Sequence, residues 1–249
     1  MRNGDRRRRW MAAVALWMAA VAALAAETSM PQQSLLEAIA TGDLEAARAA
    51  VARGADLNAA GPFQRTPLHA AVKGVDTPLL EWLLAHGANP DARDGDGRTP
   101  LHLANQTSAA ILLRHRADAS LTDRQGNSAL HVAAEDSRRM CRLLVEAGVP
   151  VNARNASGLT ALHFAVLAGK TQVAEELVAL GADVNARTVA DYSYKPSFVG
   201  WDAQGMESRV PASATPVSLA RQLHRKNRWV SGNRYAELAE YLGSKGAVE

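Results

Sequence analysis

Cysteine is almost absent from this sequence of 249 residues, which contains only Cys141. A single cysteine excludes disulfide bonds within the chain, and it excludes cysteine-rich zinc and iron–sulfur sites because each needs several sulfurs. Cys141 lies in an apolar stripe with Met140 and Leu143, so we expect a buried, inert thiol. Apolar residues make up 47% of the chain, which excludes a disordered or collagen-like protein.

Motifs of enzymes and metal sites are also missing. The chain contains no G-x-S-x-G nucleophile elbow, phosphate-binding loop, H-E-x-x-H zinc motif or dinucleotide fingerprint. The segment Asp94-Gly95-Asp96-Gly97 is faintly similar to a calcium loop, but the other EF-hand ligands are absent, so we interpret its carboxylates as turn formers. We therefore expect no catalytic residue, no cofactor and no bound metal.

The formal net charge is only +3, and its source is the N-terminus. Residues 1–25 contain five arginines and one aspartate; without them 23 basic residues face 24 acidic ones, a net charge of −1. The arginines precede an uncharged run of 17 residues, Trp10 to Ala26, which contains the triplet Ala23-Leu24-Ala25. This order predicts a secretory signal peptide over residues 1–25, then a short linker over 26–33. We expect a periplasmic or secreted protein.

The N-terminal segment leaves two alternatives open. A run of 17 apolar residues is at the lower edge of the length that spans a bilayer, so an uncleaved membrane anchor is the alternative to cleavage. The paired arginines at 6–9 suit a twin-arginine route as well as general secretion. No cysteine directly follows the apolar run, which excludes a bacterial lipoprotein anchor.

Two motifs recur in phase along the rest of the chain. The first has the form Thr/Ser-Pro/Ala-Leu-His-x-Ala, and its histidines are separated by 33, 29 and 32 residues. The second places Gly-Ala-Asp or a close variant at Gly54, Gly87, Gly148 and Gly181, with Arg116 where a fifth copy should have glycine. Two motifs in register over four copies indicate an internal repeat.

Each repeat predicts two short helices and a turn. Thr66 is a suitable N-cap, and Pro67 occupies the first helical position, where a missing N–H costs nothing. Leucines from Leu79 to Leu84 supply the apolar stripe of a second helix, which Gly87 ends. Neither helix can bury its stripe alone, so the units must stack.

These features resemble the ankyrin repeat, whose 33-residue period and T-P-L-H-x-A signature match Thr66 to Ala71 and Thr99 to Ala104. The resemblance implies an all-α solenoid of about six stacked helix-turn-helix units with connecting hairpin loops, over residues 34–249. The expected parts are a capping unit (34–64), repeats at 65–97, 98–126, 127–158 and 159–188, an insertion (189–214) and a C-terminal unit (215–249). The repeat histidines are then structural, bonding the capping hydroxyl and the backbone of adjacent turns: His69, His102, His131 and His163.

Departures from the repeat are where a particular function can be encoded. The second repeat is four residues short between its helices, so its first helix should end early and Arg116 should adopt a left-handed conformation at some cost. The insertion separates Thr160 from Thr215 by 55 residues, 22 more than the period. It contains four of the twelve aromatic residues of the chain: Tyr192, Tyr194, Phe198 and Trp201. Such side chains on a presented loop suit a protein interface, or they fold back over the last repeat; both can hold together.

A further insertion is expected inside the last unit, between Arg221 and Arg234, and it is rich in Arg and Lys. Basic segments of this kind bind nucleic acid in other settings. An exported protein rarely meets nucleic acid, so we expect no such partner here. A solvated face, an anionic partner or a membrane surface are the remaining interpretations.

We predict a non-catalytic protein–protein interaction scaffold, monomeric, acting outside the cytoplasm on an unidentified protein partner. Ankyrin stacks recognise folded proteins through loop tips and the exposed side of the first helices, so the resemblance implies binding residues at matching positions. Those on the concave face are Lys73, Glu135 and Leu167, and those at loop tips are Asp96, Arg124 and Ala156, alongside the insertion.

Two other functions stay open. One is a membrane-anchored module that holds the repeats in the periplasm. The other is an enzyme, or an accessory subunit of an enzyme or stress-defence system, with its site in the insertion, where Asp191, Asp202 and Glu207 offer acid–base groups without a partnered histidine. The layout is similar to that of periplasmic bacterial ankyrin proteins linked to oxidative-stress defence.

Overall fold

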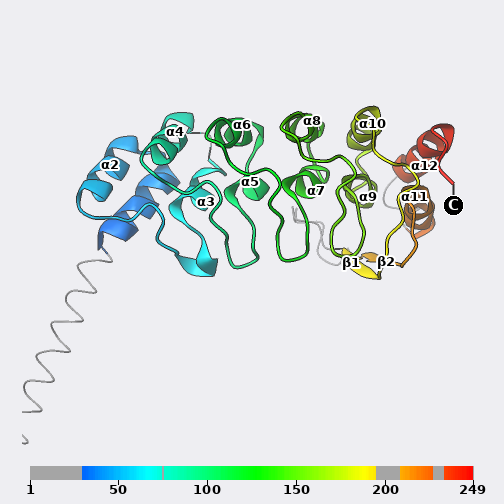
Figure 1. The fold of residues 1–249 in the computed structure, drawn as a ribbon, viewed down its shortest axis with the longest axis horizontal. Helices are drawn as coiled ribbons and strands as arrows, with labels where there is room; N and C mark the ends of the chain where they lie inside the picture. Colours follow the sequence, from blue (N-terminus) through cyan, green and yellow to red (C-terminus); the bar gives the residue numbers. More distant parts are fainter. Residues whose placement is uncertain (1–29, 75, 195–207, 227–232, 249) are drawn as a thin grey trace, which may run out of the picture. The chain divides into compact units, whose positions relative to one another are not determined.

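The computed structural model describes residues 30–74, 76–194, 208–226 and 233–248. The chain divides into two compact units, the first ending at Asn89 and the second beginning at Pro90. Both units are built from pairs of short helices joined by tight turns (Figure 1). Within the described ranges, no helix is long and apolar enough to cross a membrane.

The first unit contains a helix over residues 30–41, then α2 (Leu44–Ala52), the short 3₁₀ turn η1 (Pro62–Gln64), α3 (Pro67–Ala71) and α4 (Thr77–Ala85). Its core is made of buried leucines and alanines, among them Leu35, Ala47, Leu68 and Leu83. Residues 30–33 are already helical, so the prediction of a linker through residue 33 is wrong there.

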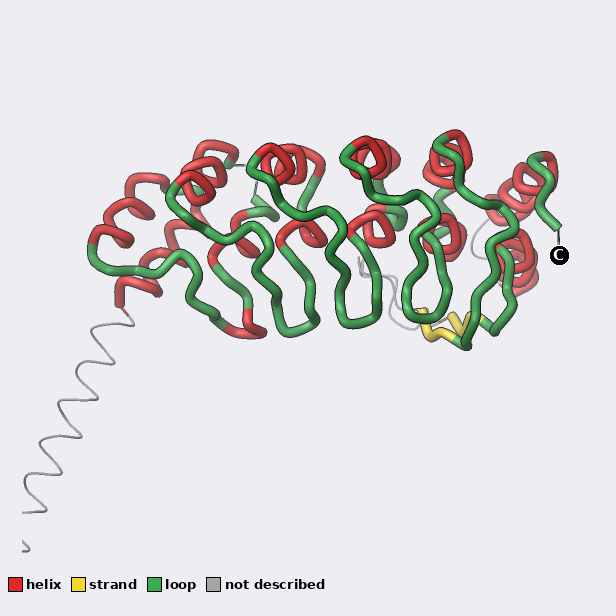
Figure 2. Tube along the Cα trace, viewed as in Figure 1, coloured by secondary structure: helices red, strands yellow, loops and turns green. Residues whose placement is uncertain are grey.

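The second unit continues with paired helices. The first helices of the pairs are α5 (Pro100–Leu103), α7 (Ala129–Ala133), α9 (Ala161–Leu167) and α11 (Pro216–Lys226). The second helices are α6 (Gln106–Arg114), α8 (Arg138–Glu146), α10 (Thr171–Ala179) and α12 (Arg234–Ser244). In this unit the first helices form one row and the second helices another, and long loops extend from the first-helix row, as the tube in Figure 2 shows. Leucines of both rows, such as Leu130 and Leu144, are fully buried between them.

The predicted helix starts are confirmed by their caps. Thr66, Thr99, Ser128 and Thr160 each form a capping box with the histidine three residues later. The ends are confirmed as well, since Gly87, Gly148 and Gly181 have φ angles of 94–96°. Arg116 takes the same left-handed conformation at φ 64°, and α5 has only four residues, as the shortened second repeat predicts.

The loops between consecutive helix pairs form hairpins that we call fingers: 61–65 in the first unit, and 94–98, 123–127 and 155–159 in the second. Each finger closes with the same pair of backbone hydrogen bonds. In the finger 155–159 the N–H of Asn155 donates to the Leu159 carbonyl, and the N–H of Gly158 donates to the Asn155 carbonyl, both at 2.9 Å. Asp94 and Asp123 also use a side-chain oxygen to accept two backbone N–H groups, which confirms the carboxylates as turn formers.

A two-stranded antiparallel sheet accompanies the helices of the predicted all-α fold. Strands β1 (Tyr192–Tyr194) and β2 (Ser208–Val210) pair in the register Tyr192 with Val210 and Tyr194 with Ser208. Each strand has three residues, too few for a period-2 pattern to be recognised in a sequence. The insertion therefore has secondary structure of its own.

The described part of the second predicted insertion belongs to the last helix pair. Residues 221–226 belong to α11, and α12 begins at Arg234. The first part of the basic segment Arg221–Arg234 therefore belongs to a helix. Gly246, at φ 85°, ends the final helix pair as the sequence predicts.

Candidate protein-binding surface

The tips of the second unit's fingers present side chains to solvent. Asp96, Arg124 and Ala156 are all exposed, as predicted for tip residues. Backbone hydrogen bonds join each tip to the next: Arg124 N–H donates to the Asp96 carbonyl at 3.0 Å, and Ala156 N–H donates to the Gln125 carbonyl at 3.0 Å. A third bond runs from the N–H of Val189 to the Ser157 carbonyl at 2.9 Å. The tips therefore form one hydrogen-bonded row.

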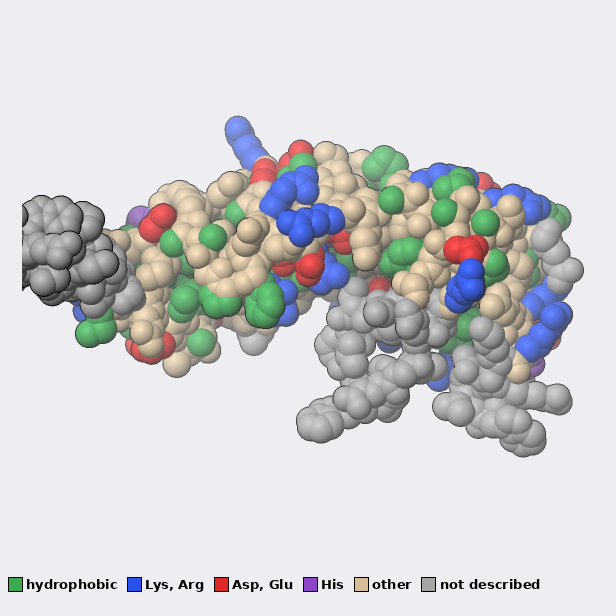
Figure 3. Space-filling view, turned by 90° about the horizontal axis from the view of Figure 1, so that it is seen from below, with side chains coloured by type: hydrophobic (Ala, Val, Ile, Leu, Met, Phe, Trp, Pro, Cys, Tyr) green, Lys and Arg blue, Asp and Glu red, His purple; other side chains and the backbone are tan. Residues whose placement is uncertain are grey.

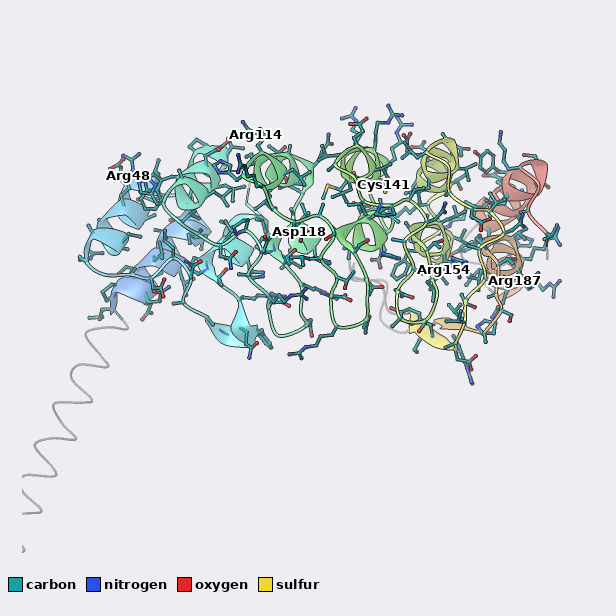
Figure 4. All side chains as sticks on the ribbon, in the orientation of Figure 1. Arg48, Arg114, Asp118, Cys141, Arg154 and Arg187 are labelled. Carbon is teal, nitrogen blue, oxygen red and sulfur yellow. The ribbon has the colours of Figure 1, made fainter. Side chains whose placement is uncertain are left out.

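Two exposed arginine side chains also link successive fingers. The guanidinium of Arg93 donates to the Thr122 carbonyl of the next finger at 2.7 Å, and that of Arg154 donates to the Arg187 carbonyl at 2.6 Å. Arg154 and Arg187 are labelled on adjacent finger segments in Figure 4. Because these bonds link successive fingers, the side chains on the tips are held at fixed spacing, which lowers the entropy lost on binding.

The repeat histidines anchor the fingers to the helices. In the second unit, the Nδ1 of His131 accepts a hydrogen bond from the Ser128 N–H at 3.1 Å, and its Nε2 donates to the Leu159 carbonyl of the next repeat, also at 3.1 Å. His102 and His163 make the same pair of bonds, to the carbonyls of Asn127 and Ala214. The structural role that the resemblance implies is thus present.

These bonds require neutral imidazoles with the proton on Nε2, because a backbone N–H can donate only to an unprotonated Nδ1. Burial disfavours the charged form, and it lowers the pKa of His131 and of His163 to about 4. Desolvation also lowers the pKa of His102. In the first unit, the Nδ1 of His69 accepts from the Thr66 N–H in the same way.

The insertion grows from the tip of a fourth finger, which spans residues 188–214. Its closing bonds repeat those of the finger 155–159: Thr188 N–H donates to the Ala214 carbonyl at 3.1 Å, and Ser213 N–H donates to the Thr188 carbonyl at 2.9 Å. Ser213, at φ 61°, takes the place of Gly158, at φ 79°. The base of the finger is therefore intact, and the extra residues replace only its tip.

Tyr192 folds back onto the helices. Its ring lies 6.2 Å from that of Phe164 in α9, and its hydroxyl donates to Gln125 Oε1 at 3.2 Å. Desolvation is the main cause that raises the pKa of the phenol, and the nearby carboxylates of Asp123 and Glu135 raise it further. Tyr192 is half-buried, so the folded-back arrangement is the one present at this residue.

Two predicted face residues are not accessible. Glu135 is 6% exposed and Leu167 is 6% exposed, so the expectation that they project from the concave face is wrong. Glu135 lies near Tyr192, a proximity that could not be predicted from the sequence. The backbone carbonyl of Leu167 accepts a hydrogen bond from the Tyr235 hydroxyl at 3.4 Å. Lys73, in the first unit, is exposed.

The remaining predicted aromatic residues are only partly covered by the structure. Tyr194 lies in β1, opposite Ser208. Phe198 and Trp201 lie outside the described residues, as do the candidate acids Asp202 and Glu207. Asp191 accepts hydrogen bonds from Arg209 and from the Ala212 N–H, and these bonds hold its pKa below the usual range. This aspartate closes the base of the hairpin.

Sequence reasoning missed Phe63, at the tip of the finger in the first unit. Its side chain is 80% exposed, the largest exposure among the exposed large apolar residues of the described chain. Phe63 and Gln64 both have left-handed backbones, at φ 58° and 57°, and such strain in non-glycine residues costs about 1–2 kcal/mol each. The signal was present in the sequence: Gly61-Pro62-Phe63-Gln64 stands where the other fingers read Asp/Asn-x-x-Gly.

No metal site accompanies these surfaces in the part of the chain that the structure describes. Groups of three or more His, Cys, Asp or Glu residues able to hold a metal ion are absent from it. Cys141 is buried, as predicted, and desolvation raises the pKa of its thiol to about 12. A thiol that stays protonated at neutral pH is a poor nucleophile.

Comparison with known families agrees with this architecture. The family model for ankyrin repeats (3 copies) matches residues 35–123 and 105–188, more than half of the chain. The protein belongs to the ankyrin-repeat family. Its fold class is therefore the all-α ankyrin solenoid, and the ankyrin repeat is a protein–protein interaction module.

Curated proteins match about half of the chain. Rabankyrin-5 of Mus musculus is 33% identical over 144 residues, 54% of this ankyrin-repeat chain and 12% of the relative. The NF-kappa-B p105 subunit of Gallus gallus is 37% identical over 142 residues, 53% of the chain and 14% of the relative. NF-kappa-B inhibitor alpha of Mus musculus is 36% identical over 131 residues, 53% of the chain and 35% of the relative. The matches thus span about a third or less of these relatives.

Proposed function

We propose that this protein is a non-catalytic scaffold that binds a folded protein partner through the finger tips of its second unit. The observation that carries the proposal is the way the insertion leaves the fourth finger. Because the closing bonds of Thr188 and Ser213 are those of an ordinary finger, the described ends of the insertion, residues 190–194 and 208–212, leave the repeat at the position of a finger tip.

The exposed side chains of this row are acidic, basic and apolar, which suits a folded partner whose surface carries both charged and apolar groups. Asp96 and Arg124 contribute opposite charges, and Val189 contributes an apolar side chain that is 67% exposed. In Figure 3, which looks onto the finger side, acidic, basic and apolar side chains are interspersed. Such a surface has no single sign of charge that would favour nucleic acid.

We extend the proposal to the compartment: the protein acts outside the cytoplasm, after removal of residues 1–25. The support comes from the sequence alone, from the five arginines followed by 17 uncharged residues and a small-x-small triplet. Mass spectrometry of the protein purified from its producing cells tests it. A mature N-terminus at or near Ala26 is expected, whereas a membrane-extracted product that retains Met1 would favour the anchored alternative.

Replacement of the insertion tests the binding surface. In the variant, a single serine replaces residues 190–212 and Ser213 becomes glycine. The new tip is then Val189 followed by serine and glycine, which matches the tip Ala156-Ser157-Gly158 of the preceding finger. Partners captured by cross-linking from the producing cells are compared by quantitative mass spectrometry. A partner bound through the insertion should be lost from the variant, while circular dichroism shows that the variant is folded.

A charge reversal gives the matched comparison. Arg124→Glu changes an exposed tip, whereas Glu240→Lys changes an exposed position of α12. The proposal expects the captured partner to be reduced by Arg124→Glu and unchanged by Glu240→Lys. Equal recovery from the wild type, the loop replacement and Arg124→Glu would overturn the assignment of the surface.

A further inference from the structure

A groove runs between the second helices α6 and α8, in the helix row opposite the fingers. It consists of two adjoining cavities of about 340 and 720 Å³ that share Leu143 and Glu146. The apolar lining comes from Ala110 and Leu113 of α6 and from Leu143 and Ala147 on the α8 side, none of them fully buried. We call this feature the α6–α8 groove. It is a surface distinct from the finger tips.

Small side chains in α6 account for the space. Aligned on the helix ends, Ser108, Ala109 and Ala110 of α6 stand where α8 has Met140, Cys141 and Arg142. α6 belongs to the shortened repeat, whose first helix α5 has four residues. Because Ala110 carries no side chain beyond Cβ, the seam that a longer residue would fill stays open.

Positive charge lines one end of the groove. Arg138, Arg139 and Arg142 all face the smaller cavity and are exposed. Arg142 is neutralised by Glu176 of α10, at 2.6 Å, whereas no described residue forms an ion pair with Arg138 or Arg139. Figure 4 labels Arg114 and Asp118 near the C-terminal end of α6, and these two line the larger cavity with opposite charges.

The two arginines do not stabilise their own helix. Arg138 and Arg139 occupy the first turn of α8, and Glu146 ends it. This order opposes the helix dipole, at a cost of about 0.3–1 kcal/mol for each charge. A surface that costs stability in the isolated chain is expected where a partner supplies the opposite charge.

We propose that the α6–α8 groove is a second docking site, for an acidic amphipathic helix of a partner protein. Apolar side chains of that helix occupy the floor between Leu113 and Leu143, and carboxylates at one end pair with Arg138 and Arg139. Two helices of nine residues give the groove a length of about 13 Å, which accommodates two to three helical turns. The site lets the protein hold one partner at the finger tips and another at the second helices.

Synthetic peptides test the chemistry directly. The probe is a fluorescein-labelled helical peptide of about 14 residues with leucines at i, i+3, i+4 and i+7 and glutamates elsewhere on its exposed face. Two controls have the same leucines with lysine in place of glutamate, and the same composition in scrambled order. Fluorescence anisotropy with the full chain should show binding of the acidic amphipathic peptide at least about tenfold tighter than that of either control. Equal binding of the scrambled or the lysine peptide would overturn the proposal.

Variants locate the site. Arg138→Glu with Arg139→Glu should weaken binding about tenfold or more, and Ala110→Trp, which fills the floor, should do the same. Arg124→Glu at the finger tip should leave peptide binding unchanged. A negative result with the peptide would therefore count against the groove and not against the finger-tip surface of the proposed function. Circular dichroism checks that each variant is folded. Hydrogen exchange of the wild type gives a measurement independent of mutation: the peptide should slow exchange in α6 and α8, and protection confined to the fingers would refute the assignment.

Discussion

The third and fourth fingers of the second unit, residues 155–159 and 188–214, have the same base and different tips. Both close with a donor and acceptor at the same positions, and both receive a histidine Nε2–H on the carbonyl before the next N-cap, from His131 and His163. The tip of one is a two-residue turn, and the tip of the other is replaced by residues 190–212. The comparison teaches that the repeat fixes the base of a finger, where its closing bonds are made, and allows the tip to be lengthened.

Acidification is expected to cause the largest loss of stability, because it acts on the buried histidines at the base of both fingers. The pKa of His131 and of His163 is about 4 when folded, against about 6.5 when unfolded. Below pH 6.5 the unfolded chain binds protons that the folded chain does not, so stability is fully present above pH 6.5 and falls as the pH decreases to 4. Each histidine should contribute about 3 kcal/mol to the loss in the free energy of unfolding.

Urea unfolding between pH 7.5 and 4 measures this loss. A free energy of unfolding that stays constant over that range would contradict neutral, buried histidines in both fingers.

Removing one histidine should destabilise the two fingers to different extents. His131→Ala removes the acceptor of the buried Ser128 N–H and one of the two donors to the Leu159 carbonyl, and it opens a cavity, so the free energy of unfolding should fall by about 3–4 kcal/mol. His163→Ala should cost less, because the bond to Ala214 is longer, at 3.3 Å. Gln172→Ala, on the exposed side of α10, is the control and should change the value by less than about 0.5 kcal/mol.

Chemical denaturation at pH 7.5 gives the three values. An equal or larger loss in His163→Ala would mean that the insertion tightens the finger beneath it.

The two tips differ in the residue at their left-handed position, which is Gly158 in one finger and Ser213 in the other. A Cβ at Gly158 would lie 2.8 Å from the Val189 backbone nitrogen, and its φ is 79°, so Gly158→Ala should lower stability by about 2 kcal/mol. Ser213 adopts the left-handed conformation with a side chain, so Ser213→Gly should raise stability by up to about 1 kcal/mol.

Paired thermal melts of these two variants compare the tips directly. Destabilisation by Ser213→Gly would show that the serine side chain contributes a bond that outweighs the strain.

The smallest effect is expected at Tyr192. Tyr192→Phe removes the hydroxyl that donates to Gln125 Oε1 but keeps the ring near Phe164, so the loss should be about 0.5–1 kcal/mol. Tyr192→Ala should lose more, because the ring contact goes as well. If both variants matched the wild type in chemical denaturation, the insertion would not pack on α9 in solution.

Most of the framework could be predicted from local signals. Thr-Pro-Leu-His predicts a capped helix because every group that it needs lies within four residues, and Gly87 or Arg116 predicts a helix end in the same way. Asp96, Arg124 and Ala156 are exposed as predicted, because a turn at the end of a hairpin leaves the side chains of its middle residues in solvent.

The accessible surface of the first helices could not be predicted. Glu135 and Leu167 occupy positions that a regular repeat exposes, but both are buried here, and Tyr192 lies beside Glu135 across 57 positions of sequence. The α6–α8 groove was missed for the same reason. In the sequence Ala110 is an ordinary helix residue. Only the structure shows that it lines a groove with Leu143 of α8.

The sequence by itself determined the family, the helix caps, the helix ends and the roles of the repeat histidines, because each depends on hydrogen bonds between residues close together in the chain or one repeat apart. Tertiary structure alone decided that the insertion rises from an intact finger, that Tyr192 packs back on Phe164, and that a lined groove separates α6 from α8. These features depend on which surfaces meet and how much volume their side chains fill. Packing of that kind is a property of two distant segments together, and neither segment encodes it alone.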